Sequence, residues 1–415
     1  MNRQTETFLS PLFLRLFIPF GIAHFMSVLL GSANAIMSPI LTDTFSLTPA
    51  DLGFMTSVYL IFFGMTQFPL GVFLDRYGAR KTLAPFLLLA AVGVLIFSLA
   101  QSMGHLIISR AVLGVGMSGC LMSAFKAYTE WLPKERLPLA FSIQCLTGGI
   151  GGIVATQPVL WAIGIMPWRS FFMLLALLTL AAAALIWLVV PSREKASESS
   201  SVGFCTLLLE MMHFLKDPRF WYIAPVAIAG QSVMFGYIYL WIGPWMRDVA
   251  SMSESRGGSF MMAAGIGAAA GYFLNGVLAD WFRKNQLVSD EKIYLFSGTF
   301  LTFLIAVIAF CNDASVAWMW GIVMFFSTMV MISFALMRNL FAANEVGRAL
   351  SLLNFAIFLA SFFTQWFIGL VLNCYPVTDG RFSAEGHRVA LIFIVLFNLA
   401  AVVHFYFGLR KRGKI

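Results

Sequence analysis

Charged residues are scarce in this chain of 415 residues: Asp, Glu, Lys and Arg together make up 11% of it. Soluble globular proteins have about 25%, so a soluble fold is excluded. Acidic residues are the scarcest, with 19 Asp and Glu against 27 Lys and Arg. Hydrophobic residues make up 60% of the chain, and the mean hydropathy is +0.85. This composition predicts an all-α integral membrane protein, because helices satisfy their own backbone hydrogen bonds inside a bilayer.

Cysteine is also scarce, and the five cysteines are scattered at or inside apolar runs, with no C-x-x-C pair and no Cys/His cluster. They are expected to be packing residues, so neither a disulfide nor a metal or other cofactor is predicted. The chain also lacks H-E-x-x-H and G-x-S-x-G motifs, which disfavours an intramembrane enzyme. It has no basic runs interleaved with exposed aromatic residues, so no nucleic-acid partner is expected.

Long apolar runs are what the chain has in abundance. A run of about 20 apolar residues crosses a bilayer as a helix. Twelve such runs are present, at 16–42, 51–74, 82–101, 104–131, 138–162, 169–191, 219–246, 257–281, 291–311, 315–341, 347–374 and 387–409. No cleavable signal is expected, because the first run is too long and no small-residue cleavage site follows it.

The distribution of Lys and Arg predicts the orientation. If the N-terminus is cytoplasmic, nineteen Lys and Arg fall in inner segments and five in outer ones, while Arg110, Lys126 and Arg338 lie within spans. Positive residues concentrate on the cytoplasmic side, so both termini are expected there. The net charge of +8 reflects this topology. With short loops, the expected location is a bacterial inner membrane, with the lipid bilayer as partner and the chain as a monomer.

One signature occurs twice, each time at the end of an apolar run. The first copy is Gly71-Val72-Phe73-Leu74-Asp75-Arg76-Tyr77-Gly78-Ala79-Arg80-Lys81, and the second is Gly276-Val277-Leu278-Ala279-Asp280-Trp281-Phe282-Arg283-Lys284. The Gly and Asp of the two copies are 205 residues apart, about half of the chain. The chain here resembles the major facilitator superfamily of secondary transporters, which carries G-x-L-x-D-R-x-G-R-[KR] between helices 2 and 3 and a weaker copy between helices 8 and 9.

The repeat extends beyond this loop. At the same offset Pro39 matches Pro244 and Asp43 matches Asp248, and at an offset of 212 Lys126 matches Arg338. Such repeats indicate two pseudo-symmetric six-helix bundles with the substrate between them, near the bilayer midplane. The predicted domains are a first bundle at 1–191, a cytoplasmic linker at 192–217 and a second bundle at 218–415.

The resemblance implies a set of gating residues. In the family the loop Asp caps a neighbouring helix end and pairs with basic residues, which stabilises the outward-facing state. Arg110-x-x-x-Gly114-x-Gly116 is similar to a second family motif whose Arg has been linked to proton transfer, although an Arg near a helix end can also extend to the interface. The predicted gating residues are Gly71, Asp75, Arg76, Gly78, Arg80, Asp280, Arg110, Arg136 and Arg348.

Lys126 and Arg338 are the main indication of the substrate. They occupy equivalent places in helices 4 and 10, which line the central cavity in the family. Two cations that face each other suit a carboxylate or a phosphate. Two other interpretations remain: both residues are charges of an inner gate, or Lys126 pairs with Glu130 four residues later.

Polar stripes on helices 1 and 7 complete the predicted site. His24, Ser27 and Asn34 share one helical face with Gly31 and Ser38. The predicted substrate-binding residues are Lys126, Arg338, His24, Ser27, Asn34, Gln231, Tyr239 and Ser123. Asp43 and Asp248 are expected near outer helix ends and Glu130 near an inner one, so proton coupling through a buried acid of helix 1 is not supported.

The predicted function is secondary active transport of a small polar metabolite with an anionic group, by alternating access, as proton-coupled uptake (a symporter) or exchange. The alternative is an efflux antiporter for amphiphilic compounds. Drug/proton antiporters of the family carry G-x-x-x-G-P-x-x-G-G in helix 5, whereas here Gly148-x-x-x-Gly152 is followed by Ile153. The missing Gly-Pro disfavours that alternative.

Overall fold

The computed structural model describes residues 11–133, 136–191, 214–285, 288–329, 332–342, 345–378 and 380–413. Its regular structure is helical, apart from an isolated bridge between Thr378 and Arg381. The linker predicted at 192–217 falls mostly on residues 192–213, outside the described residues. The exact domain boundaries therefore stay a prediction.

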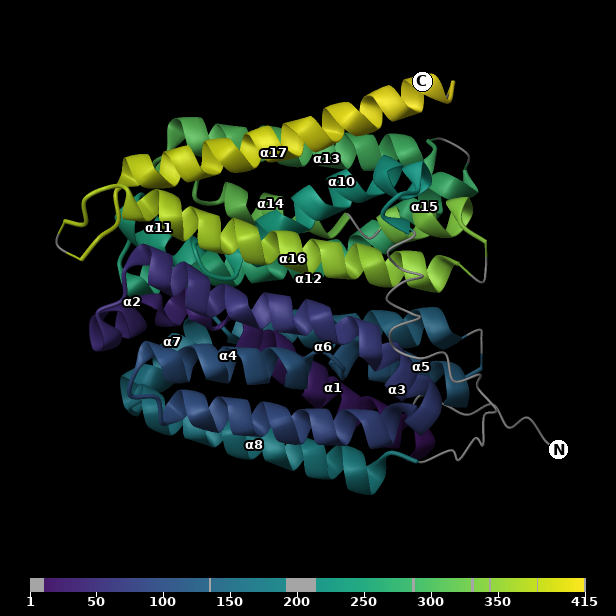
Figure 1. Ribbon diagram of the computed structural model, residues 1–415, viewed down its shortest axis with the longest axis horizontal. Helices are drawn as coiled ribbons and strands as arrows, with labels where there is room; N and C mark the ends of the chain where they lie inside the picture. The colour runs from purple at the N-terminus through teal and green to yellow at the C-terminus, as the bar shows by residue number, and fades with distance from the viewer. Residues whose placement is uncertain are drawn as a thin grey trace.

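The helices form two groups, drawn below and above one another in Figure 1. The first group contains α1 (Pro11–Ser32), α2 (Asn34–Phe45), α3 (Pro49–Ser98), α4 (Met103–Met117), α5 (Cys120–Trp131), α6 (Leu137–Val154), α7 (Gln157–Ile165) and α8 (Trp168–Val189). The second contains α10 (Pro218–Ser232), the π-helix η2 (Val233–Ile238), α11 (Ile242–Asp248), α12 (Glu254–Lys284), α13 (Asp290–Cys311), the short η3 (Ala314–Val316), α14 (Met319–Thr328), α15 (Ile332–Leu340), α16 (Val346–Asn373) and α17 (Ala384–Lys411).

These helices account for twelve membrane crossings. Ten helices of the described residues are long and apolar enough to span a bilayer, and α6 with α7 makes an eleventh span, bent by 49°. Helix α3 has 50 residues, about 75 Å at 1.5 Å per residue, whereas the hydrocarbon core is about 30 Å thick. It therefore crosses twice and supplies the twelfth span. The predicted all-α membrane fold of two six-helix groups is confirmed.

Gly78 makes the turn between the two arms of α3. Its backbone angles are φ 75° and ψ 170°, a conformation that residues with a side chain rarely adopt. The hydroxyl of Thr82 donates to the carbonyl of Phe73 across the bend at 3.0 Å. Arg80 donates to the carbonyl of Val190 at 3.4 Å, and so ties the loop to the end of α8.

The two ends of the bundle are named here after their loops. The Gly78 end also holds the start of α1 and the finish of α17, on the right in Figure 1. The Gly380 end, on the left, holds the α16–α17 loop. Residues equivalent in the repeat lie at the same end, as expected for two halves of parallel topology.

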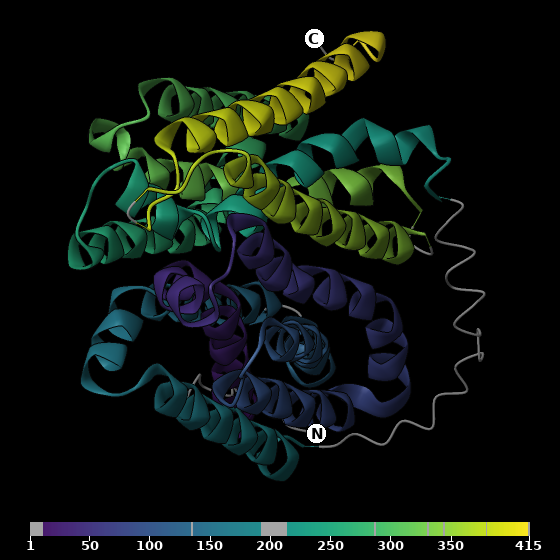
Figure 2. The same ribbon diagram turned by 60° about the vertical axis from the view of Figure 1, so that its left-hand side comes forward.

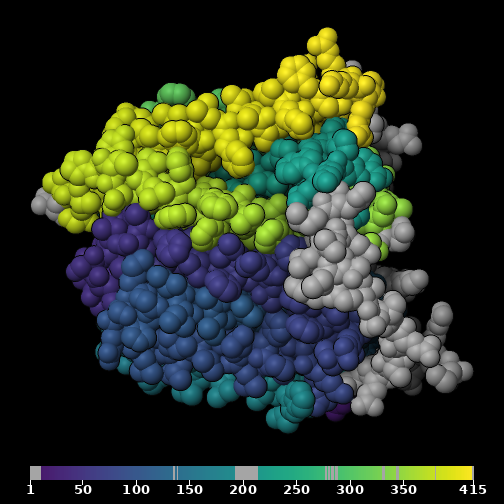
Figure 3. Space-filling model, viewed as in Figure 1, coloured from purple at the N-terminus to yellow at the C-terminus, as the bar shows by residue number. Residues whose placement is uncertain are grey.

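The two groups meet along several helix pairs, of which α3 with α16 and α6 with α12 make the most extensive contacts. Figure 3 shows the first arm of α3 lying directly against α16, and Figure 2 shows the same boundary from another side. One large buried apolar cluster crosses the boundary, and a second one packs α10, α15, α16 and α17 together. The boundary between the groups is where the sequence predicts the substrate to lie.

Candidate functional site between the two halves

The halves are closed against each other at the Gly380 end. Gly243 of α11 lies so close to the carbonyl of Ala35 in α2 that an added methyl group would overlap it. A methyl at Gly369 of α16 would lie 2.5 Å from the carbonyl of Pro49 at the start of α3. Gly258 of α12 is in equally close contact with Gln157 of α7. Three pairs of helices, one from each half, thus close the boundary at this end, around a cavity that α2, α7, α11 and α12 line.

The contact between α3 and α16 continues through the middle of the bundle as a row of aromatic rings. Phe63 lies 4.6 Å from Phe358, and Phe68 lies 4.6 Å from Phe355, measured between ring centroids. Nearer the Gly78 end, Gly71 of α3 and Gly347 of α16 have open space beside them. An added methyl group at either glycine would meet nothing within 4 Å. The tight interlocking of the two helices therefore ends before the Gly78 end.

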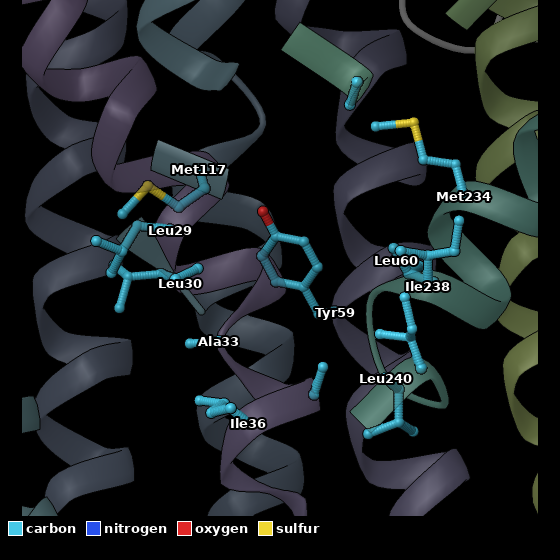
Figure 4. Packing of buried hydrophobic residues seen from close by; sticks show 14 of the residues in the cluster. Leu29, Leu30, Ala33, Ile36, Tyr59, Leu60, Met117, Met234, Ile238 and Leu240 are labelled. Carbon is cyan, nitrogen blue, oxygen red and sulfur yellow. The ribbon is translucent and has the colours of Figure 1, made fainter. Parts of the chain in front are cut away.

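Three tyrosines lie near one another between the two halves: one on α3, one just after η2 and one on α12. Tyr59 of α3 is within electrostatic range of Tyr239, which follows η2, and Tyr239 is in turn within range of Tyr272 of α12. Figure 4 shows the ring of Tyr59 between Met117 on one side and Met234 on the other. Tyr239 was predicted to line the site, but Tyr59 and Tyr272 were not, because nothing in their sequence spacing separates them from packing residues.

His24 of α1 packs against α6. Its ring is in very close contact with Gly148 of α6, and its Nδ1 is buried with no hydrogen-bond partner among the described residues. Only glycine leaves room for the imidazole at this crossing. His24 is thus held between α1 and α6, and its role in binding stays a prediction.

Ser27 and Asn34 of the same stripe face the interior of the first half. The hydroxyl of Ser27 donates to the carbonyl of Met117 at 3.3 Å. Asn34 accepts a short hydrogen bond from Arg110, which also donates to the carbonyl of Leu30 at 3.2 Å. The side chain of Arg110 is 1% exposed, so it clamps α4 onto α1 and does not extend to the membrane surface.

Two other predicted binding residues are fully buried inside their own halves. Gln231 donates to the carbonyl of Ser327 at 3.5 Å, and its side-chain oxygen has no partner among the described residues. Ser123 of α5 is completely buried, and its hydroxyl is likewise unpartnered in the described part of the chain. Both keep a free polar atom, so their role in binding stays a prediction.

Lys126 and Asp75 form an ion pair near the Gly78 end. The Lys126 ammonium lies 2.6 Å from the Asp75 carboxylate and 3.6 Å from Glu130, four residues along α5. The Asp75 side chain is 67% exposed and that of Lys126 is 30% exposed. The pair joins α3 to α5 within one half. The predicted role of Lys126 in substrate binding, and the alternative role as a gate charge, stay predictions.

Arg338, predicted to bind the substrate, lies toward the Gly78 end, as do the remaining predicted gating residues. Arg338 is exposed in the last turn of α15, and Arg76 is exposed beside Tyr77. Arg136 is the N-cap residue of α6, and Arg348 lies in the first turn of α16. The backbone of Asp280 belongs to α12, but its side chain is outside the described residues. That Lys126 and Arg338 face each other across the central cavity stays a prediction.

The two acids expected near outer helix ends, Asp43 and Asp248, differ in how exposed their side chains are. Asp43 is exposed, whereas the side chain of its repeat mate Asp248 has no exposed surface. Burial of Asp248 comes from α17, whose His387 lies over it. Sequence spacing could not show this, because the covering residue is 139 positions away in the chain.

The sequence profile of the Major Facilitator Superfamily matches residues 20–365. The chain belongs to this family. The hexuronate transporter of Escherichia coli K12 is 24% identical over 347 residues, 79% of this chain and 80% of that one. The galacturonate transporter of Dickeya chrysanthemi is 24% identical over 291 residues, 66% of this chain and 84% of its own length.

Solved structures show the same fold. A bacterial homologue of the human lysosomal transporter Spinster, in an inward-facing and occupied conformation, matches with a TM-score of 0.75 and 16% identity over 97% of both chains. The nucleoside transporter NupG matches with a TM-score of 0.73 and 13% identity, over 94% of this chain and 99% of that one. The protein is therefore a multi-pass membrane transporter for a small molecule and not an enzyme, as the sequence predicted.

Proposed function

We propose that this protein takes up a small sugar acid of the hexuronate type across a bacterial inner membrane, together with a proton or in exchange for another anion. Its similarity to transporters named for hexuronate, galacturonate and L-galactonate is the observation that carries this proposal. These molecules unite a carboxylate with several hydroxyl groups, which agrees with the small anionic metabolite expected from the sequence.

The centre of the boundary offers suitable chemistry for such a substrate. Tyr239 and Tyr272 bring hydroxyl groups for hydrogen bonds, and all three tyrosines bring ring faces for contact with a sugar ring. The three residues come from both halves, although the hydroxyl of Tyr59 is turned to Gly31 of α1. His24 adds a buried nitrogen that can donate or accept a hydrogen bond. Because both halves contribute, a bound substrate would hold them in one arrangement.

Lys126 acts in this state as a gate residue, since its ammonium is already held by Asp75 and Glu130. A substrate carboxylate could use Lys126 only after Asp75 releases it. Arg338, exposed at the end of α15, remains a candidate first contact for an anion that enters or leaves at the Gly78 end.

The proposed orientation places the Gly78 end in the cytoplasm. The Lys and Arg distribution supports it, because Arg76, Arg80, Arg136 and Arg348 lie toward that end. With the Gly380 end sealed, the structure then corresponds to an inward-facing state. Alternating access requires a second state in which the seal at the Gly380 end opens.

Cysteine labelling tests this orientation. In a background without the native cysteines, Thr378→Cys, exposed in the α16–α17 loop, should react in intact cells with a membrane-impermeant maleimide. Gly347→Cys, exposed in the first turn of α16, should react only after the membrane is opened. The reverse pattern would refute the topology.

Uptake into proteoliposomes tests the substrate. Purified protein with an inward-directed proton gradient should accumulate labelled galacturonate or glucuronate. Tyr239→Phe, which removes one hydroxyl at the boundary, should raise KM about tenfold, because a hydrogen bond to a polar substrate contributes about 1 kcal/mol or more. The control is Tyr406→Phe on the exposed face of α17. If no sugar acid enters while amphiphilic dyes are expelled, the efflux alternative replaces this proposal.

A further inference from the structure

A buried ionisable cluster in the second half has no role in the site described above. The side chains of Asp248 on α11 and His387 on α17 have no exposed surface, and their Oδ2 and Nε2 atoms are 3.6 Å apart. The other ring nitrogen of His387 lies 3.5 Å from the hydroxyl of Tyr237. Arg247 completes the cluster, with two contacts to Asp248 at 2.6 and 3.1 Å.

Among the described residues, the other ionisable groups near His387 on its own and neighbouring elements have partners other than the imidazole. On α17 itself Glu385 and Arg388 pair with each other at 2.8 Å. Asp313, at the start of η3, accepts from the backbone of Ser315, and Tyr375 packs on Gly386. Asp248 and Tyr237 are therefore the ionisable side chains in direct contact with the imidazole, and Arg247 acts on it through Asp248.

This cluster adjoins a cavity of about 210 Å³ that lies between the halves at the Gly380 end. Its walls come from α2, α7, α11 and α12, and its charged lining residues are Arg247 and Glu254. Glu254 is exposed in the first turn of α12, whereas the Arg247 side chain is 22% exposed and turned toward Asp248. The carboxylate of Asp248 is thus shared between a cavity-lining guanidinium and a buried imidazole.

Burial of Asp248 is not a requirement of the repeated fold, because its repeat mate Asp43 is exposed. Charged groups inside a membrane protein are costly and usually serve function. A buried ion pair is also weak evidence for stability, since desolvation offsets the attraction. We therefore expect the cluster to have a function in addition to holding α11 and α17 together.

We propose that Asp248 and His387 form a proton-binding site, and that its occupation frees Arg247 to bind the carboxylate of a substrate in the cavity at the Gly380 end. The proton comes from the outer aqueous phase and adds to the imidazole without any other covalent change. Imidazolium then takes Asp248 as its partner. This proposal rests on the proposed uptake of a sugar acid and deepens it.

The charge count explains why proton and substrate would move together. The empty cluster holds one guanidinium, one carboxylate and a neutral imidazole, and so has no net charge. A proton alone makes the cluster positive, and a monoanion alone would make it negative. Only the combination restores neutrality, and a neutral cluster is the form that can be closed away from water at the lowest cost.

The first arm of the test compares two modes of transport in His387→Gln. Accumulation of galacturonate driven by a proton gradient should fall at least tenfold. Exchange of galacturonate at equal pH on both sides should be weakened and should lose its increase between about pH 7.5 and 5.5, because Arg247 stays with Asp248 at every pH. His105→Gln, an exposed histidine bonded to Ser102, is the matched control. Wild-type accumulation by His387→Gln would overturn the proposal and leave the proposed function standing.

The second arm needs no substrate. Ile36→Cys places a thiol on the buried wall of the cavity. Thiol reactivity itself falls with pH, so the labelling rate is divided by that of the exposed Thr378→Cys at the same pH. This relative rate should rise severalfold when the outer pH falls from about 7.5 to 5.5, and His387→Gln should abolish that rise. If the wild type carries no sugar acid, the proposed function fails, and this arm still decides the role of His387. An unchanged pH response in the variant overturns the proposal.

Asp248→Asn covers the case in which His387→Gln does not fold, as judged by gel filtration. Without the carboxylate Arg247 is free at every pH, so labelling at Ile36→Cys should be high throughout and the response to pH should disappear. Accumulation should also lose its dependence on the proton gradient. A wild-type pH response in this variant would overturn the proposal as well.

Discussion

Replacing Gly243 by Ala should nearly abolish transport while the protein still folds. The added methyl group would overlap the carbonyl of Ala35 in the other half of the molecule. Overpacking of this kind costs about 1–3 kcal/mol, and every 1.4 kcal/mol is a tenfold change in population. The cost falls only on the state in which the Gly380 end is closed, because α2 and α11 separate when that end opens. Transport should therefore fall by about tenfold to a hundredfold.

Labelling separates a blocked gate from a damaged fold. In Gly243→Ala the thiol of Ile36→Cys should react faster from outside, because the Gly380 end stays open. Gly347→Ala is the matched control, since its methyl would meet nothing within 4 Å. Gly116→Ala should instead lower thermal stability, because its methyl would lie 2.5 Å from the backbone of Ala90 in the same half. Normal transport by Gly243→Ala would contradict the seal described here.

Asp75→Asn should slow transport about tenfold with little loss of stability. The ion pair between Asp75 and Lys126 is partly exposed, and such pairs contribute about 0–1 kcal/mol to folding. The larger effect of Asp75→Asn is expected in the state in which the Gly78 end is closed. The N-terminus of α16 lacks a side-chain cap here, and a carboxylate is favoured at such an end. When the Gly78 end closes, Asp75 can move from Lys126 to that position.

Transport rate and apparent stability should be measured together for this variant. Asp43→Asn, which removes an exposed carboxylate at the opposite end, is the control and should transport normally. The charge swap Asp75→Lys with Lys126→Asp restores the pair but offers the wrong charge to α16, so it should rescue stability better than rate. Transport at the wild-type rate in Asp75→Asn would remove this residue from the gate.

Much of the architecture could be read from local patterns. Apolar runs predicted the twelve crossings because a bilayer imposes a minimum length on each of them. The spacing of 205 residues between Asp75 and Asp280 predicted two halves, since a duplicated signature marks a duplicated structure. Gly78 was expected in a loop, and its positive φ gives the reason for glycine at this position.

The site was predicted less completely, because its residues come from helices far apart in the chain. Ser27 and Asn34 were predicted to share one helical face toward the substrate, and that face turns inward to Met117 and Arg110 of the same half. Periodicity shows which residues of one helix point the same way, and it contains nothing about the helix that lies opposite. Tyr59 and Tyr272 were missed for this reason.

The sequence alone determined the class of protein, the number of crossings, the repeat and the family, because each of these is recorded as length, composition or spacing along one chain. Only the tertiary structure decided the partner of each charge. Lys126 is held by Asp75 of another helix, and Asp248 is buried although its repeat mate Asp43 is exposed. Burial and pairing depend on which side chains approach through space, and this is fixed only when the helices pack.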